Sequence, residues 1–205
     1  MTELIRIAKM RVFKAGRCIS ALEELVVEAG ERVLLTGSNG SGKTTLLRVL
    51  ATLEVQYEGM CQVGVVARER IYVHQMPSLF RGTALGNARY GLKARSIPRT
   101  RRNEVARQWL ARLGVEHIAA QPVRTLSGGE RRRLALARAF AVQPKLLLLD
   151  EPFADLDDEG VARICDCLEL LGDATTVVLS SPTAIDDHLS ARVIQMRAVS
   201  RGDQA

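Results

Sequence analysis

The sequence predicts an α/β protein with a mainly parallel sheet and a largely helical insertion. Apolar runs of four or five residues, each bounded by polar residues, are typical of strands buried on both faces. These runs alternate along the chain with helical patterns, which favours a parallel sheet. The block from about 77 to 140 lacks strong strand signals, and we therefore expect it to be a mostly helical insertion into the α/β core.

The individual elements follow from these patterns. Strand-like runs lie at 32–36, 70–75, 146–150, 175–180 and, with a weaker pattern, 192–196. Helical patterns lie at 43–51, 99–113, 128–141 and 159–171. We expect one domain over residues 1–205, with a core of 1–76 and 141–205 and a helical subdomain at about 77–140.

The composition is that of a globular protein with a basic surface. A chain of 205 residues that is 47% hydrophobic can bury one good core. The net charge of +6 comes partly from arginines within 99–113 and 131–133, which fit either solvated helix faces or a nucleic-acid surface. Only 4% of the residues are aromatic, and they do not alternate with basic residues in the way that single-stranded nucleic-acid platforms use. We therefore expect no nucleic-acid partner.

The N-terminus and the cysteines both indicate the cytoplasm. No apolar signal region begins the chain, and the longest apolar run, 146–149, is far shorter than the roughly 20 residues of a membrane span. Cys165 and Cys167, two positions apart on a predicted helix, point in diverging directions. We therefore expect buried or partly buried free thiols rather than a zinc site or a disulfide.

The segment GSNGSGKTT, residues 37–45, has the spacing of a phosphate-binding loop and lies between a predicted strand and a predicted helix. Its glycines allow successive N–H groups to turn inward, and the helix start adds a positive dipole end. Lys43 would reach the β- and γ-phosphates of a nucleotide, and the Thr44 hydroxyl would bind Mg²⁺.

Two carboxylates at the end of a buried strand complete this chemistry. Asp150 ends the run LLLLD, where it can accept from water bound to Mg²⁺, and Glu151 follows directly. A carboxylate in the second position can polarise an attacking water, which is the general-base task of phosphoryl transfer.

A second glycine-rich helix start lies at Ser127, Gly128, Gly129 and Glu130, where N–H groups again suit a phosphate. One chain already holds its nucleotide with the loop at 37–45. The second anion site therefore makes sense if it faces the nucleotide of a partner chain.

Together these motifs resemble the nucleotide-binding subunit of an ATP-binding cassette (ABC) transporter, in that family's order and spacing over nearly the whole chain. The matches are Walker A (37–45), the Q-loop (Gln75), the signature (126–130), Walker B (Asp150), the catalytic glutamate (Glu151) and the D-loop (154–157). The resemblance implies a P-loop NTPase core with a mainly parallel sheet, an N-terminal antiparallel β portion and a helical subdomain.

The resemblance also implies the ligands, ATP and Mg²⁺, and their contacts. Lys43, Gln75 and Glu151 take the catalytic roles, and Thr44, Gln75 and Asp150 hold the metal. ATP is contacted by Gly37, Ser38, Asn39, Gly40, Ser41, Gly42, Lys43, Thr44, Thr45, Ser127, Gly128, Gly129 and Glu130. Phe13 lies where the family places an aromatic that stacks on adenine, although a lone phenylalanine is also a common core residue.

The implied partners are a second copy of the chain, membrane permease subunits and a substrate-binding protein. Two ATP molecules would be sandwiched in a head-to-tail homodimer. The segment 76–92 follows the Q-loop, where the family couples to permeases and where Met76, Leu79 and Phe80 could line a groove or belong to the core of the insertion. The segment is similar to those of tungstate or phosphate importers, and the subunit would lie on the inner face of the membrane.

One departure from the family pattern affects catalysis. A histidine normally follows the strand after Walker B and contacts the γ-phosphate, whereas aligning 192–194 with the last strand places Ser181 there, followed by Pro182. A serine hydroxyl is shorter and carries no positive charge, so we predict slow hydrolysis with ATP binding intact. His188, seven residues later, is a poor substitute.

Two other hypotheses remain open at this point. The chain could be a soluble ATP-gated module acting on nucleic acid, although only 84 residues separate Lys43 from Ser127, too few for the coiled coil of repair-type ABC proteins. It could also be a regulatory module with weak hydrolysis. The presence of Ser181 at the position of the family's histidine is the reason for this hypothesis.

Overall fold

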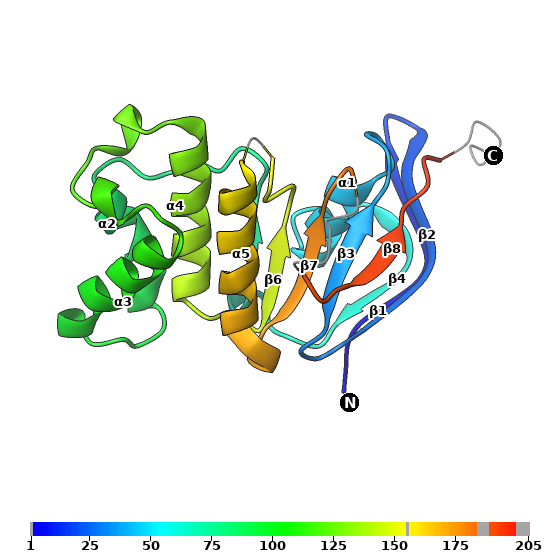
Figure 1. Cartoon of the computed structure of the whole chain (residues 1–205). Coiled ribbons are helices and arrows are strands. Elements are labelled where there is room, and N and C mark those ends of the chain that lie inside the picture. The colour runs from blue at the N-terminus through cyan, green and yellow to red at the C-terminus, as the bar shows by residue number, and fades with distance from the viewer. Residues whose placement is uncertain (1, 155, 184–188, 200–205) are drawn as a thin grey trace. The chain divides into compact units, whose positions relative to one another are not determined.

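A computed structural model describes residues 2–154, 156–183 and 189–199. The described residues form two compact units, labelled by their helices and strands in Figure 1. The first lies within Met1–Tyr72, Lys145–Glu151 and Asp173–Ala205, and the second within Val73–Pro144 and Pro152–Gly172. The second includes the segment after Glu151, which the sequence grouped with the core.

A five-stranded sheet organises the first unit. Its order is β5(Arg70–Val73), β6(Leu146–Leu149), β7(Thr176–Ser180), β3(Arg32–Thr36) and β8(Arg192–Gln195). The pairs β3–β7, β3–β8 and β6–β7 are parallel. Every residue of β6 and β7 is buried, which explains why these strands appear in the sequence as short unbroken apolar runs.

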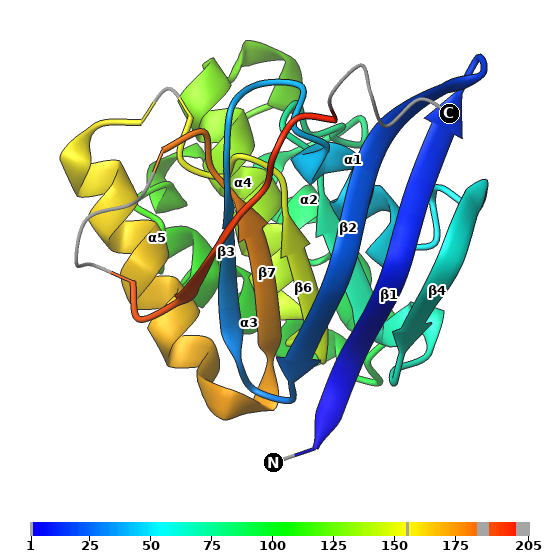
Figure 2. The same ribbon diagram turned by 90° about the vertical axis from the view of Figure 1, so that its right-hand side faces the viewer.

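The first unit also contains a three-stranded antiparallel sheet, which is built from strands nearer the N-terminus. Its order is β2(Arg17–Glu28), β1(Glu3–Lys14) and β4(Tyr57–Val63), and Figure 2 shows the three strands side by side. Helix α1(Lys43–Leu50) packs against strands of both sheets. The buried core formed in this way includes Ile5, Ile7, Met10, Val12, Leu25, Val27, Val33, Leu35, Leu46, Leu47, Leu50, Leu146, Leu148 and Val178.

The second unit is helical. Its helices are α2(Ala84–Ala88), α3(Arg99–Arg112), α4(Gly128–Ala141) and α5(Asp158–Leu171). Short 3-10 helices lie at η2(Tyr90–Lys93), η3(Glu116–Ile118) and η4(Val123–Thr125). The first unit has η1(Ala67–Glu69), and η5(Gly172–Ala174) lies where the chain passes from the second unit to the first. Helices α2, α3 and α4 pack on one another, with Trp109 of α3 in edge-to-face contact with Phe140 of α4, 5.5 Å between ring centroids.

The predicted fold class is confirmed, including the antiparallel N-terminal portion and the helical region. Strand β5 ends at Val73, so the expected strand at 70–75 is too long, and His74 and Gln75 follow the strand rather than belong to it. Cys165 and Cys167 lie buried on α5, and burial raises the pKa of both thiols to about 11.

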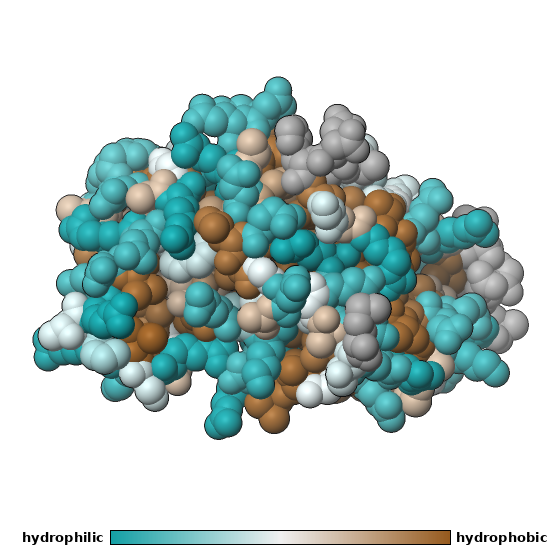
Figure 3. All heavy atoms as spheres, turned by 60° about the horizontal axis from the view of Figure 1, so that its bottom comes forward, coloured by the Kyte–Doolittle hydropathy of each residue, from teal (hydrophilic) through white to brown (hydrophobic). Residues whose placement is uncertain are grey.

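Among the described helices, none has the length and apolarity needed to cross a lipid bilayer. On the face drawn in Figure 3, hydrophobic residues form small separate areas among hydrophilic ones. Exposed large apolar residues do occur, and two of them, Phe80 and Tyr90, stack on each other.

Candidate active site

The phosphate loop follows β3 directly and depends on two glycines. Gly37 has φ of 141°, and a Cβ there would lie 2.3 Å from the Met196 carbonyl oxygen. Gly42 has φ of 92°, and a Cβ there would lie 2.3 Å from the Ser20 hydroxyl oxygen. Any other residue at these two positions would be strained and would clash, so the loop conformation requires glycine.

The positive charge of the loop, on Lys43, lies at the start of α1. Gly42 is the N-cap and offers no side chain to the first N–H groups of the helix, which leaves them able to bind an anion. Lys43 is only 5% exposed, and its Nζ donates to the carbonyl oxygens of Gly37 at 2.6 Å and Ser38 at 3.2 Å. The ammonium group thus lies across the loop, close to the N–H groups that would hold phosphates.

Asp150, directly after β6, accepts hydrogen bonds from several hydroxyl groups. Its Oδ1 accepts from Thr44 Oγ1 and Ser180 Oγ, each at 2.9 Å, and its Oδ2 accepts from the Tyr72 hydroxyl at 3.0 Å. The Asp150 residue is 3% exposed. The first of these contacts brings together Thr44 and Asp150, which the sequence predicted as metal-binding residues 106 positions apart.

Glu151 has an unusual backbone. Its φ is 47°, in the left-handed region that non-glycine residues rarely adopt, and its N–H donates to Ser180 Oγ at 3.0 Å. The Glu151 residue is half-buried and directly follows Asp150 in the chain. Backbone strain of this kind is often found at functional sites, where the surrounding structure maintains it.

Tyr72 and Ser180 are site residues that the sequence did not single out. Both appeared only as members of predicted strands, and no local spacing connects them with Asp150. Burial, together with the neighbouring Asp150 carboxylate, raises the pKa of Tyr72 above its ordinary value of 10.0, so the phenol stays protonated and donates.

Phe13 lies near the loop and outside the core. It is half-buried near the end of β1, and the preceding residue, Val12, pairs with Ser20, which contacts Gly42. Phe13 is absent from the buried core of the first unit and from the partly buried residues packed on it. Adenine stacking by Phe13 stays a prediction.

A family model described as ABC transporter matches residues 23–154. The chain belongs to the ABC transporter family. TupC of Peptoclostridium acidaminophilum, a tungstate uptake system ATP-binding protein, is 32% identical over 169 residues, 80% of this chain and 79% of TupC.

A second ABC relative is longer than this chain. The molybdate/tungstate import ATP-binding protein WtpC of Pyrococcus horikoshii is 40% identical over 147 residues, which cover 67% of this chain and 43% of WtpC. This chain therefore spans less than half of WtpC. Among solved structures, the dimeric post-hydrolysis state of the ATP-binding cassette MJ0796, bound to ADP and Pi, matches with a TM-score of 0.84 at 25% identity, over 95% of both chains.

These findings confirm an ABC ATPase that binds ATP. The roles of individual residues remain predictions, and several of those residues belong to the second unit. There the ABC signature forms a complete capping box at the start of α4: Ser127 Oγ accepts from the Glu130 N–H at 3.3 Å, and Glu130 Oε2 accepts from the Ser127 N–H at 2.8 Å. These bonds hold the pKa of Glu130 below its ordinary value.

Gln75 lies in the same unit, in the loop after β5. Its carbonyl oxygen accepts from Arg132 Nη2 at 3.2 Å, and the side of α4 that carries Arg132 also lines a pocket of about 480 Å³ with Gln75. The lining residues are Gln75, Met76, Pro77, Ser78, Gly128, Arg131 and Arg132. The Q-loop and the signature helix of this ABC domain are therefore in contact within one unit.

Ser181, at the expected position of the ABC histidine, directly follows β7. It is 6% exposed, and its N–H donates to the Leu35 carbonyl oxygen at 3.0 Å. Of the D-loop, Ala154, Leu156 and Asp157 are described, and Asp157 caps α5 by accepting from the Gly160 N–H at 2.9 Å. Asp155 and His188 lie outside the described residues.

The segment after the Q-loop exposes apolar side chains. Met76 is 78% exposed and Phe80 is 47% exposed, so neither is core of the helical unit, whereas Leu79 is half-buried. Phe80 stacks on Tyr90, with 4.2 Å between ring centroids, and Arg138 lies over the Phe80 ring at 5.2 Å. We call Phe80 and Tyr90 the aromatic pair.

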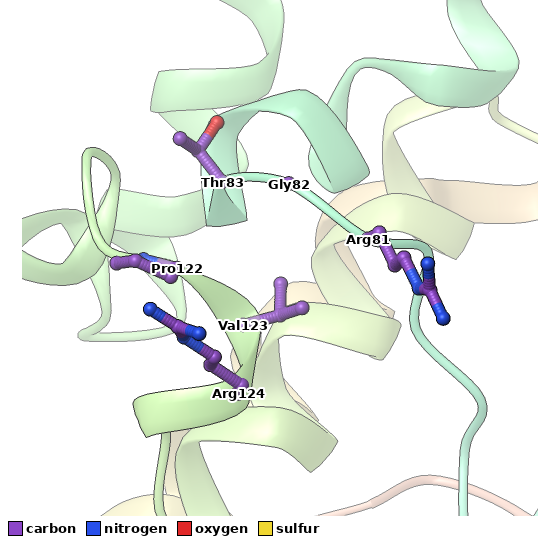
Figure 4. A pocket seen from close by; sticks show the side chains of 6 residues that line it. All are labelled: Arg81, Gly82, Thr83, Pro122, Val123 and Arg124. Atoms are coloured by element: carbon purple, nitrogen blue, oxygen red, sulfur yellow. The ribbon is translucent and has the colours of Figure 1, made fainter.

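A pocket of about 600 Å³ lies further along the same segment, where Val123 N–H donates to the Gly82 carbonyl oxygen at 3.0 Å. In Figure 4 the guanidinium groups of Arg81 and Arg124 lie on either side of Val123. The lining is Arg81, Gly82, Thr83, Pro122, Val123 and Arg124.

Proposed function

We propose that the chain is the ATP-hydrolysing subunit of a membrane importer, and that its substrate is a tetrahedral oxyanion of the tungstate or molybdate type. The observation that carries the catalytic part is the convergence of Thr44 and Ser180 on Asp150, with Ser180 also bound to the Glu151 N–H. The import direction and the oxyanion class are supported by the printed functions of TupC and WtpC.

In this proposal the site residues of the first unit have defined tasks. Lys43 and the N–H groups of residues 37–45 bind the β- and γ-phosphates, and Phe13 stacks on adenine. Thr44 and Asp150 fit Mg²⁺ because a hydroxyl and a carboxylate are oxygen ligands. The amide oxygen of Gln75, in the second unit, stays a predicted ligand. Bound Mg²⁺ would neutralise phosphate charge, while Glu151 would accept a proton from the attacking water.

Residues 1–205 act as a single ABC ATPase domain that works as a homodimer. Ser127, Gly128, Gly129 and Glu130 of one copy would contact the ATP held by the phosphate loop of the other. The matching dimeric cassette structures support this arrangement. Two chains that each carry +6 gain from placing two triphosphates between them.

The partners would be permease subunits and, upstream of them, a substrate-binding protein. We expect the aromatic pair and Met76 to receive a short permease helix, which would hold the chain on the cytoplasmic face of the membrane. Arg81 follows Phe80 in the chain and lines a pocket together with Arg124, and the two guanidinium groups suit an acidic side chain on that helix.

The catalytic test is steady-state ATP turnover of the purified chain. We expect Glu151→Gln to reduce kcat at least about 100-fold, because the general base is lost, while nucleotide affinity is kept. Equal turnover of Glu151→Gln and the unchanged chain would contradict the assigned role.

The partner test is copurification with a coexpressed permease. Phe80→Ala and Tyr90→Ala should weaken it without changing the turnover of the isolated chain. Leu170→Ala, which removes another exposed apolar side chain, on α5, is the matched control. Vesicles that contain the assembled complex should take up tungstate in an ATP-dependent way, and uptake of neutral solutes alone would contradict the oxyanion assignment.

A regulatory module with weak hydrolysis is the second candidate. Ser181 is the observation that favours it, since an uncharged, buried hydroxyl stands where the family has its histidine. Turnover within the ordinary range of ABC ATPases would exclude this alternative.

A further inference from the structure

The Asp150 carboxylate is held by more groups than the family motifs supply. Thr44 belongs to the phosphate loop, but Tyr72 at the end of β5 and Ser180 at the end of β7 belong to no motif. Between them, these hydroxyl groups contact both carboxylate oxygens, Thr44 and Ser180 on Oδ1 at 2.9 Å and Tyr72 on Oδ2 at 3.0 Å. The carboxylate therefore cannot rotate without breaking a hydrogen bond.

Ser180 also connects the two acidic residues. Its hydroxyl donates to Asp150 Oδ1 and accepts from the Glu151 N–H at 3.0 Å, and the residue is fully buried. The Ser180 hydroxyl therefore uses both its O–H donor and one of its acceptor lone pairs. Without this hydroxyl, the Glu151 N–H would lose the hydrogen bond that helps maintain the backbone at a φ of 47°.

Tyr72 performs the complementary task from the opposite oxygen. Its ring is half-buried in the first unit and packs against the core, and its hydroxyl donates to Asp150 Oδ2 at 3.0 Å. An O–H group in this position fixes the plane of the carboxylate and leaves the Thr44 side of Oδ1 unchanged. Loss of a group that orients a metal ligand from behind typically lowers metal affinity about 10- to 100-fold.

We propose that Tyr72 and Ser180 are positioning residues, which together hold the Asp150 carboxylate and the Glu151 backbone in the arrangement that Mg²⁺-dependent ATP binding and hydrolysis require. This inference rests on the proposed function. It predicts that their loss affects the magnesium-dependent part of nucleotide binding and leaves the phosphate loop itself intact.

The first experiment measures the Kd of a fluorescent ATP analogue in Mg²⁺ and in EDTA. For Tyr72→Phe we expect affinity in Mg²⁺ to fall about 10-fold, the effect common for groups that orient a metal ligand, with no change in EDTA. Tyr57→Phe, the same chemical change on a half-buried tyrosine of β4, should alter neither value. Equal Kd values for Tyr72→Phe and the unchanged chain in Mg²⁺ would overturn the role of Tyr72.

The second experiment separates the two tasks of Ser180. Ser180→Ala should lower affinity in Mg²⁺ and also lower kcat at saturating Mg²⁺·ATP, whereas Ser180→Thr, which keeps the hydroxyl, should retain more of both. Thermal unfolding of each variant shows whether it is folded. A folded Ser180→Ala with unchanged kcat and unchanged affinity in Mg²⁺ would overturn the role of Ser180, and Tyr72→Phe remains informative if Ser180→Ala does not fold.

The two levels of the proposal fail in different ways. If the unchanged chain binds no nucleotide, or binds it equally in Mg²⁺ and EDTA, the proposed function fails and the inference fails with it. If the unchanged chain shows the magnesium effect and both variants match it, only the positioning role is wrong.

Discussion

Gly42 and Gly40 have similar backbone conformations in different surroundings. Their φ values are 92° and 82°, but a Cβ at Gly42 would meet Ser20, whereas a Cβ at Gly40 would have nothing within 4 Å. We expect Gly40→Ala to cost about 1 kcal/mol of unfolding free energy from backbone strain alone. Gly42→Ala should cost about 3 kcal/mol, because the contact with Ser20 adds to the strain.

Urea unfolding without nucleotide, followed by circular dichroism, measures both values. A Ser20→Gly background removes the Oγ and Cβ atoms that a residue-42 methyl group would meet, so Gly42→Ala should cost less there. Equal costs of the two alanine variants would show that crowding at Ser20 does not constrain the loop.

Ser181 leads to a prediction about rate. Restoring a cationic side chain near the γ-phosphate, as Ser181→His does, should raise kcat about 10-fold or more. Ser181→Asn, also larger than serine and polar but unable to carry charge, is the matched control and should not raise it. Turnover at saturating Mg²⁺·ATP, measured on variants whose thermal midpoints show that they are folded, checks this, and a folded histidine variant no faster than asparagine would contradict it.

The sequence predicted those candidate site residues that lie close together along the chain in a recognisable spacing. Gly37 to Thr45 lie in one loop, and Asp150 and Glu151 are adjacent. Tyr72 and Ser180 could not be predicted, because their partner Asp150 is 78 and 30 positions away and only the order of strands in the sheet brings them together. A hydroxyl at a strand end gives no signal in a single sequence.

At the scale of the element, the strands differ in how clearly the amino-acid sequence indicates them. Strand β6 is buried along its whole length, and the sequence shows it as four leucines. Strand β1 is longer and was not located, because Lys9 lies at a φ of 50° and the pairing with β2 shifts between Val12 and Phe13. Such irregularities break the alternation of apolar and polar residues that identifies a half-buried strand.

The capping box at the start of α4 predicts that the stability of the folded chain depends on pH. Hydrogen bonds from Ser127 lower the pKa of Glu130, so the ionised carboxylate stabilises the folded state. For a depressed carboxyl pKa this stabilisation is complete well above the unfolded value of 4.5 and is lost as the pH falls through the folded value. Glu130→Gln should therefore cost about 1 kcal/mol near neutral pH and progressively less below pH 4.5.

Thermal unfolding without nucleotide at several pH values measures this difference. A His117→Ala background is used for both chains, because His117 Nε2 lies 3.4 Å from Glu130 Oε1 and would contribute its own charge. Glu23→Gln, at an exposed position of β2, is the control. A cost of Glu130→Gln that stays constant from neutral pH to pH 3 would contradict the assignment.

At the scale of the whole molecule, two of the described helix starts are predicted to bind phosphate, and they lie in different units, Gly42 in the first and Ser127 in the second. A single nucleotide needs only one phosphate loop. In the proposed homodimer, the second helix start would complete a site on another copy, and each ATP site would then need both chains.

Nucleotide-driven association therefore provides the last prediction. Glu151→Gln with saturating Mg²⁺·ATP should give a light-scattering mass twice the 22.5 kDa of one chain, and without nucleotide it should give the mass of one chain. In the Glu151→Gln chain, adding either Ser127→Arg, which fills the signature, or Lys43→Ala, which disables the phosphate loop, should abolish dimers. Mixing these two defective chains should restore some of them, because one intact phosphate loop then meets one intact signature. Dimers formed by Ser127→Arg alone, or no recovery on mixing, would exclude a head-to-tail arrangement.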